Sequence, residues 1–283
     1  MKDVVVLTSS ELRHDFVRQA LGIADGIRVS RSYREGLGGT TTESVRSAES
    51  EIKRSHLEAR ARAEQDFFGS FVDLVDDRTN PVDIERGAIN DPEQYNEIID
   101  LEPDLVLAYG CSLVDSPLLD AFEGRFLNVH LGLSPYYRGT GTNFWPLVNE
   151  EPEYVGATFM HIDEGVDTGE IIHQIRARVY PGDSPHQIGN RLIADMTHVY
   201  IELVRRFDRL ESVEQPAAPR EEHYYTSADY SEAATETLYE NFDDGLVDRY
   251  LSEYESRTQA VPIVTNPALA GYEPASEVPF GER

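Results

Sequence analysis

The sequence is poor in cysteine and has no long apolar run. Cys111 is the only cysteine in 283 residues, which excludes an internal disulfide framework and a zinc cluster of the usual cysteine spacing. No apolar run approaches the roughly 20 residues that a membrane-spanning helix needs, and the run at residues 4–7 is too short for the core of a signal peptide. We therefore expect a cytoplasmic protein with no membrane partner and no metal site.

Lysine is also scarce, and the charge is strongly one-sided. The basic residues number 25, of which only Lys2 and Lys53 are lysines, against 52 acidic residues, for a net charge of −27. Such a charge disfavours a nucleic-acid partner. The acidic surface either attracts cations or basic proteins, or is an adaptation to a salty cytoplasm, where repulsion is screened within about 3 Å at 1 M salt. We favour halophilic adaptation because the acidic residues are spread along the chain.

What the sequence does contain is an alternation of short apolar strands with helices. We predict strands at residues 4–7, 27–29, 104–108, 126–129, 155–162 and 170–179, and helices after residue 11, at 92–99 and from 184 to about 207. This order predicts an α/β fold with a Rossmann-like, open, mostly parallel sheet. Ligands bind at the carboxyl ends of the strands in such sheets, so we expect residues 110–114 and 128–130 to face one cleft.

Two further segments extend the predicted fold. A long helical insertion is expected at about residues 43–76, where few helix breakers occur. We predict a catalytic domain over residues 1–215 and a small, acidic, Tyr-rich C-terminal extension over 216–283, with short helices near 231–242 and 245–254 and a partly irregular tail.

Two motifs carry polar side chains suited to chemistry. In "NVHLGLSPYYRG", at residues 128–139, Asn128 and His130 stand two residues apart at the end of a predicted strand and so project to the same side. In "DEGVDTGE", at residues 163–170, two glycines among acidic residues mark a tight loop between two strands. His161 and His173, in the strands beside this loop, are assigned to packing or edge contacts.

These motifs resemble the signatures of the folate-dependent formyltransferase family. The first resembles the family's Asn-x-His motif with its following Leu-x-Pro-x-Tyr-Arg-Gly, and "GATFMHIDEGVDTGEII", at residues 156–172, resembles its apolar strand and Asp-x-Gly loop. The similarity extends through "PDLVLAYGCSL", at residues 103–113, and covers roughly residues 100–200. It implies the formyltransferase fold and 10-formyltetrahydrofolate as the formyl donor.

The resemblance also implies roles for individual residues. Transfer of a formyl group to an amine develops an oxyanion and moves two protons. Asn128 would donate to the oxyanion, His130 would exchange protons or hydrogen bonds with the reacting atoms, and Asp167 would orient His130 and relay a proton through water. The folate would lie between the backbone of residues 111–114 and the second loop. The implied folate-binding residues are Cys111, Ser112, Leu113, Val114, Asp163 and Gly165.

The acceptor side is less defined. Family members that use phosphate-bearing acceptors have a Gly-rich loop after the first strand, and residues 8–14 contain no glycine, which argues against glycinamide ribonucleotide. Arg13 and His14 could still receive an anionic acceptor, although Arg13 could equally be a solvated charge. Tyr137 and Arg138 either shape the acceptor site or belong to a Pro-Tyr-Tyr turn that packs on Trp145.

The sequence thus predicts an N-formyltransferase that acts on a small-molecule amine. Transfer RNA is disfavoured because the resembling transfer RNA enzymes carry a larger, basic C-terminal domain, whereas the region after residue 219 is short and acidic. By elimination, the acceptor is an amino sugar on a nucleotide carrier or another small metabolite amine. One alternative is a 10-formyltetrahydrofolate hydrolase, although the related deformylases carry an extra N-terminal domain. The other is a non-catalytic folate-binding module. The sequence leaves the acceptor's identity and the oligomeric state open.

Overall fold

A seven-stranded sheet forms the centre of the described structure. The computed structural model describes residues 1–36, 50–216 and 223–272. Within them the strands run in the order β3-β2-β1-β4-β5-β7-β8, parallel from β3 to β5 and antiparallel from β5 to β8. Their bounds are β1 Lys2–Ser9, β2 Ile27–Gly36, β3 Pro81–Glu85, β4 Leu105–Tyr109, β5 Phe126–His130, β7 Gly156–His161 and β8 Ile171–Arg176. The predicted open, mostly parallel α/β fold is confirmed.

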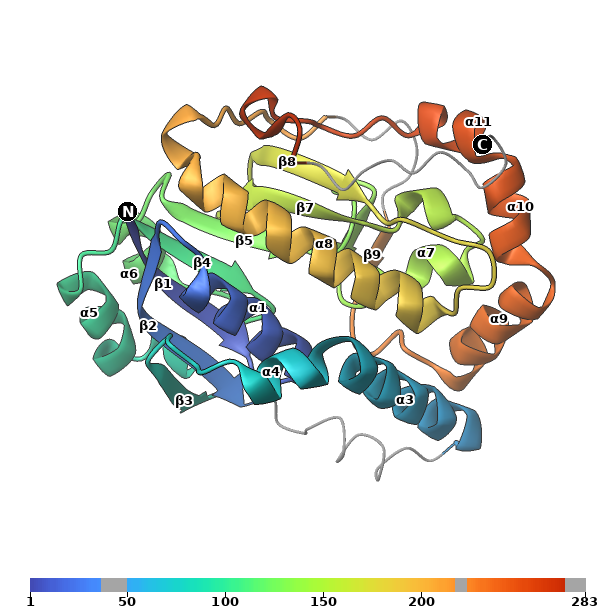
Figure 1. Cartoon of the computed structure of the whole chain (residues 1–283), viewed down its shortest axis with the longest axis horizontal. Helices are drawn as coiled ribbons and strands as arrows, with labels where there is room; N and C mark the ends of the chain where they lie inside the picture. The colour runs from blue at the N-terminus through green and yellow to red at the C-terminus, as the bar shows by residue number, and fades with distance from the viewer. Residues whose placement is uncertain (37–49, 217–222, 273–283) are drawn as a thin grey trace.

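Helices cover both faces of this sheet. Helices α1 (Leu12–Ile23) and α8 (Pro185–Arg205) lie across one face (Figure 1), and α5 (Pro92–Asp100) and α6 (Ser116–Ala121) pack on the other. Successive residues of β1 alternate between the two layers: Val4 and Val6 join the core cluster under α1 and α8, whereas Val5 and Leu7 join the cluster under α5 and α6. Burial on both faces explains why this strand is an unbroken apolar run.

The helical insertion follows β2. Helix α3 (Glu51–Glu64) is capped by Ser50, whose side chain accepts a hydrogen bond from the Lys53 amide. It continues through a π-helical turn, η1 (Gln65–Gly69), into α4 (Ser70–Leu74). The predicted start of the insertion, residues 43–49, lies outside the described residues. Strand β3 was not predicted, because only alternate residues of this edge strand are partly buried and it begins with a proline.

The described part of the C-terminal region packs against the same core as the strands. Strand β9 (His223–Tyr225) pairs in parallel with β6 (Tyr137–Gly139), beside α7 (Trp145–Val148). Helices α9 (Glu232–Asp243), α10 (Leu246–Ser252) and α11 (Tyr254–Ala260) follow. Leu238, Leu246 and Leu269 belong to the core cluster under α1 and α8. The division into domains at residue 215 stays a prediction.

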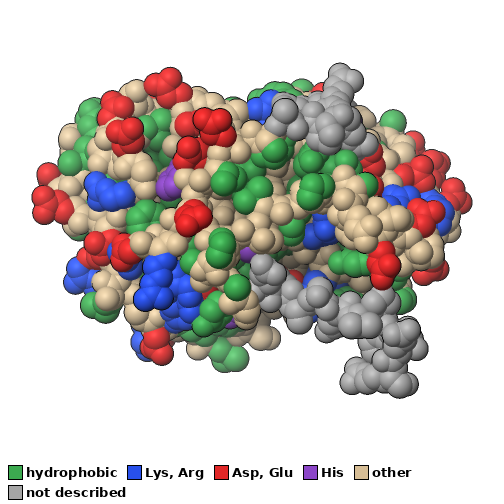
Figure 2. Space-filling view, turned by 90° about the horizontal axis from the view of Figure 1, so that it is seen from above, with side chains coloured by type: hydrophobic (Ala, Val, Ile, Leu, Met, Phe, Trp, Pro, Cys, Tyr) green, Lys and Arg blue, Asp and Glu red, His purple; other side chains and the backbone are tan. Residues whose placement is uncertain are grey.

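The surface carries its acidic side chains in a dispersed pattern. Figure 2 shows Asp and Glu scattered over the face that it presents, with Lys and Arg between them. Among the described residues, none of the helices has the length and apolar character that crossing a membrane would require. Halophilic adaptation stays a prediction.

Candidate active site

The topology creates a crevice between β1 and β4. From β1 the chain moves to β2 and β3 on one side, and it returns at β4 on the other side. Loops that leave the carboxyl ends of two such strands diverge, and ligands bind in the space between them. A cavity of about 720 Å³ lies there, lined by residues that follow β1, β4 and β5. Its volume is in the range of small-molecule sites.

His130 and Asp167 meet at this cavity. His130 ends β5 and is 7% exposed, and its Nδ1 lies 3.2 Å from Asp167 Oδ1. On the other side of the ring, Nε2 lies 3.0 Å from the carbonyl oxygen of Tyr137. Both partners can only accept, so each contact is a hydrogen bond only when the ring nitrogen carries a proton. The carboxylate and the carbonyl together fix the orientation of the imidazole.

The loop that carries Asp167 is held in an unusual backbone conformation. Asp167 has φ +56°, in the left-handed region that few residues other than glycine adopt. Its Oδ2 accepts a hydrogen bond from the Gly139 amide at 3.0 Å, and Gln215 Nε2 donates to its carbonyl at 2.8 Å. A Cβ on Gly169 would lie 1.8 Å from the His161 carbonyl oxygen, so the loop requires glycine there. These contacts direct the carboxylate toward His130.

Asn128 lies on the same strand as His130 and also lines the cavity. It pairs with Ala108 of β4 and Met160 of β7, and it is partly exposed. The two side chains project from the same side of β5, as their spacing predicted. An amide, an imidazole and a carboxylate are thus brought to one cavity, as the sequence predicted for Asn128, His130 and Asp167; their catalytic roles stay predictions.

The loop after β4 forms one side of the cavity. Cys111, Ser112 and Leu113 line it, and Leu113 is 68% exposed. Burial raises the pKa of the Cys111 thiol to about 12, with Glu35 adding to the shift. Val114 does not line the cavity, contrary to the prediction. It is 8% exposed and packs in the apolar cluster under α5 and α6, because it already belongs to the approach to α6.

Gly110, at the start of this loop, lies against His14 of α1, the helix that follows β1. It has φ +69°, and a Cβ there would lie 2.6 Å from His14 Nε2. Any other residue would therefore be strained in its backbone and would also displace His14. The close approach ties the two loops of the crevice together.

The second loop supplies Asp163 and Gly165, which both line the cavity as predicted. Asp163 Oδ1 accepts hydrogen bonds from the Gly165 amide at 3.0 Å and from Thr168 Oγ1 at 2.8 Å. This oxygen is therefore engaged in shaping the loop. The same loop continues to Asp167, so its shape affects the position of the carboxylate.

Arg13 and His14 line the cavity, but neither is a freely solvated charge. Arg13 Nη1 lies 2.9 Å from Glu64 Oε1 and 3.6 Å from Glu11. His14 is 3% exposed, and its ring lies 4.8 Å from that of Tyr109. Burial, with Arg13 and Arg60 nearby, holds the pKa of His14 well below its usual value. The imidazole is neutral near pH 7.

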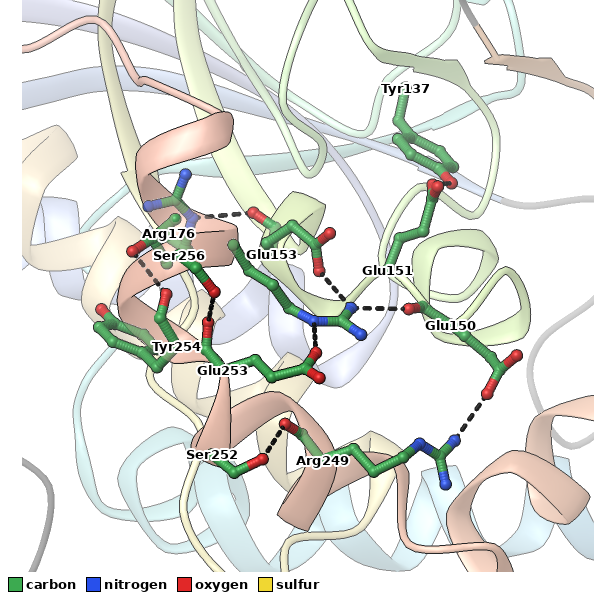
Figure 3. A network of polar contacts seen from close by, with 12 residues as sticks. Tyr137, Glu150, Glu151, Glu153, Arg176, Arg249, Ser252, Glu253, Tyr254 and Ser256 are labelled. Atoms are coloured by element: carbon green, nitrogen blue, oxygen red, sulfur yellow. Dashed lines mark hydrogen bonds and ion pairs between the residues drawn. The ribbon is translucent and has the colours of Figure 1, made fainter.

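Tyr137 and Arg138 do not line the cavity, contrary to one of the two predicted placements. The Tyr137 side chain is fully buried, its hydroxyl donates to Glu151 (Figure 3), and its ring stacks on His223 at 4.7 Å. Its side chain turns away because β6 pairs with β9 and points this ring into the aromatic cluster that includes Trp145. Only the Tyr137 carbonyl reaches the site, through His130.

Among the cavity residues that were not predicted, four polar side chains come from two helices. His56 and Arg60 come from α3, and His186 and Asn190 come from α8. The rings of His56 and His186 lie 4.7 Å apart, and burial lowers the pKa of His56 to about 3 and that of His186 to about 4. No local motif marks them, because they converge from segments more than a hundred residues apart in the chain.

The two histidines near the second motif have different surroundings in the structure. His161 lines the cavity, and burial lowers its pKa. His173 is fully buried in β8, where its Nδ1 accepts a hydrogen bond from the Asn266 amide at 3.1 Å. Within residues 1–36, 50–216 and 223–272, no group of three or more His, Cys, Asp or Glu side chains is arranged to hold a metal ion.

The fold and the site together define a class of protein: an open α/β protein whose switch-point crevice holds an Asn, His and Asp set suited to acyl transfer. The family model described as "Formyl transferase" matches residues 50–204. The chain belongs to the formyl transferase family, which confirms the resemblance seen in its motifs.

Similar proteins agree with this assignment. A methionyl-tRNA formyltransferase of Desulforamulus reducens is 32% identical over 143 residues, which are 50% of this chain and 43% of that protein. The match thus spans less than half the length of this relative. The fold resembles glycinamide ribonucleotide transformylase 1 from Symbiobacterium toebii, with a TM-score of 0.52, 22% identity and coverage of 76% of this chain and 95% of that one. It also resembles a sugar N-formyltransferase from a Shewanella species, with a TM-score of 0.53, 14% identity and coverage of 84% and 86%.

Proposed function

We propose that this protein is a folate-dependent N-formyltransferase, which moves a formyl group from 10-formyltetrahydrofolate to a primary amine. The observation that carries the proposal is the meeting of His130 and Asp167, at 3.2 Å, at a cavity that Asn128 also lines. Formyl transfer needs a donor to the developing oxyanion and a group that moves protons, and these three side chains supply both.

In this mechanism each residue has one role. The Asn128 amide donates a hydrogen bond to the formyl oxygen as negative charge develops on it. The imidazole of His130 exchanges its Nε2 contact with the Tyr137 carbonyl for one with the reacting atoms, and there it takes part in the transfer of a proton from the incoming amine to the departing nitrogen. Asp167 holds the ring through Nδ1, and it keeps this position because the Gly139 amide binds its other oxygen.

The cavity fits a folate donor. The loop residues 111–113 form one wall and the Asp163–Gly165 turn lies in the second lining loop, so a flat ring system has a place between two backbone segments. Several lining residues also have buried polar atoms that find no hydrogen-bond partner among the described residues, including Ser9 Oγ, Asn143 Oδ1 and Asn190 Nδ2. A bound molecule with polar edges would satisfy such atoms.

For the acceptor we propose a small-molecule amine, with an amino sugar carried on a nucleotide as the first class to test. The acceptor end of the cavity is formed by α1, α3 and α8, where Arg13 and Arg60 both pair with Glu64. The sugar N-formyltransferase among the structural neighbours supports the class. The net charge of −27 opposes transfer RNA. A cytoplasmic, salt-rich location completes the proposal.

An assay with 10-formyltetrahydrofolate tests the proposal. The protein is incubated with the donor in high salt, with and without a panel of amines, and formylated product and formate are both measured. We expect product with at least one amine and little formate without an amine. Formate release that needs no amine would instead identify a hydrolase, and failure to bind the donor would overturn both activities.

A further inference from the structure

Two side chains from neighbouring segments form hydrogen bonds with the backbone of the cavity wall, residues 110–113. These are Glu35, near the end of β2, and Asn90, in the 3-10 turn η2 (Ala88–Asn90). Neither side chain lines the cavity in the described structure. Both therefore act on a ligand only through the wall.

Glu35 binds two backbone amides with its two carboxylate oxygens. Its Oε2 accepts from the Ser112 amide at 2.6 Å, and its Oε1 accepts from the Gly87 amide at 3.0 Å. The residue is 3% exposed. Two donors face this side chain, so a carboxylate satisfies both, whereas a glutamine would present an NH₂ group to one of them. Burying an ionised group is costly unless such hydrogen bonds are made. The two amides are therefore what allows a carboxylate to be buried at this position.

Asn90 holds the next part of the wall. Its Nδ2 donates to the Leu113 carbonyl at 2.9 Å, and its Oδ1 accepts from the Asp115 amide at 2.8 Å. The Asn90 amide in turn donates to the Gly87 carbonyl at 3.1 Å. Gly87 is also bound by Glu35, so the two side chains belong to one connected support that holds the wall at residues 112 and 113 and the chain just beyond it at residue 115.

We propose that Glu35 and Asn90 are positioning residues that set the place of the 110–113 wall and thereby the affinity for the folate donor. The inference rests on the proposed function, because it takes the occupant of the cavity to be a folate. The far end of the wall is already fixed by Gly110 against His14. Without Glu35 or Asn90, the middle of the wall moves away from the donor while Asn128, His130 and Asp167 keep their positions.

The test compares Glu35→Gln and Asn90→Asp with the wild type. Each variant keeps the size of the side chain and loses one hydrogen bond to the support. We expect the Kd for tetrahydrofolate, measured by titration calorimetry, to rise about tenfold. This is the size of effect expected when one hydrogen bond of a charged or buried group is lost. At saturating donor the kcat should stay within about threefold of wild type. A purely structural role would lower the unfolding midpoint without this split between Kd and kcat.

Glu202→Gln is the matched control. Glu202 is another buried carboxylate, 5% exposed, which pairs with Arg205 and Arg206 at the end of α8 away from the cavity. Its substitution should reduce stability and leave the Kd unchanged. Unaltered tetrahydrofolate binding in both Glu35→Gln and Asn90→Asp would overturn the inference while the proposed function stands. A wild-type protein that does not bind tetrahydrofolate would overturn the proposed function and the inference with it.

Discussion

Two polar regions of this molecule are built in opposite ways. In the corner where residues 150–154 meet α10 and α11, charged side chains bind one another. Arg257 pairs with Glu153 and Glu253, and Arg249 pairs with Glu150 (Figure 3). At the cavity, several buried polar atoms find no partner within the described part of the chain, among them Ser9 Oγ and His186 Nε2.

The difference indicates that the charged corner contributes to stability, whereas the cavity serves function. A buried polar group without a partner destabilises a fold, so a cluster of such groups beside a cavity is expected where a ligand completes the bonds. A region in which charged side chains pair with one another gains less from a ligand, although the Tyr250 hydroxyl of α10 is also without a hydrogen-bond partner among the described residues. The comparison predicts that substitutions at the cavity change activity more than stability, and that substitutions in the corner do the reverse.

The largest expected effects come from substitutions in the Asn128, His130 and Asp167 set, of which Asn128→Ala is the first. It should lower kcat by about 10²- to 10³-fold, because the lost amide acts on the developing oxyanion. Tetrahydrofolate binding and the unfolding midpoint should stay close to wild type. Steady-state kinetics and a thermal melt on the same preparation check both statements.

Asp167→Asn is the companion substitution and should be at least as damaging to kcat. It keeps the shape of the side chain that the Gly139 amide binds, but it replaces the carboxylate that holds His130. Wild-type turnover in either variant would show that the roles assigned here are wrong.

The sequence predicted the site better than its surroundings. Asn128 and His130 stand two residues apart at the end of one predicted strand, so strand periodicity was enough to place them on one side of it. Asp167 lies in a loop, and its place beside them was implied by the resemblance to the family's Asp-x-Gly motif. The β6–β9 pair and the convergence of His56 with His186 depend on contacts between distant segments, which no local pattern records. Tyr137 shows the limit: its position in the motif left open both the acceptor site and a turn that packs on Trp145, and only the pairing of β6 with β9 puts its ring in the aromatic cluster with Trp145.

The next largest effect should come from salt. Acidic residues exceed basic ones by 52 to 25, and lowering salt from 1 M to about 0.01 M lengthens the screening distance from roughly 3 to 30 Å. Repulsion over the whole surface should then outweigh any single ion pair. We expect the unfolding midpoint to rise steadily with potassium chloride toward molar concentration.

The salt experiment also sharpens the comparison between the two regions. If the paired charges of the corner governed stability, added salt would weaken them and the midpoint would fall. A midpoint that is flat or that rises as salt is removed would contradict halophilic adaptation. It would make the acidic surface a candidate site for a basic partner.

A smaller effect is expected from the corner itself. Arg257 donates to the side chains of Glu153 and Glu253 and to the Glu150 carbonyl. Arg257→Ala should lower the free energy of unfolding by about 1–2 kcal/mol, since part of each charged contact is screened by solvent. Arg249→Ala is the matched control: this side chain is 42% exposed, so the loss should be below about 1 kcal/mol. Donor affinity and kcat should be unchanged in both variants. If either variant lost activity without losing stability, the corner would have a functional role, contrary to the comparison.

The smallest effect concerns pH and His173, which ties β8 to the chain near Asn266. Burial lowers the pKa of His173 to about 4, and its Nδ1 accepts from the Asn266 amide only while it is unprotonated. The unfolded chain, with a pKa near 6.5, binds a proton in the interval where the folded chain does not. Stability is therefore fully present above about pH 6.5 and is lost as the pH falls toward 4. Between pH 7.5 and 5.5, protonation linked to this residue should lower the free energy of unfolding by on the order of 1 kcal/mol.

His173→Asn keeps an acceptor for the Asn266 amide and cannot titrate, so its unfolding free energy should fall less over this interval than that of the wild type. Denaturant melts at the two pH values measure the difference, with the exposed His198→Asn as control. An equal fall in wild type and His173→Asn would show that this imidazole does not govern the acid response.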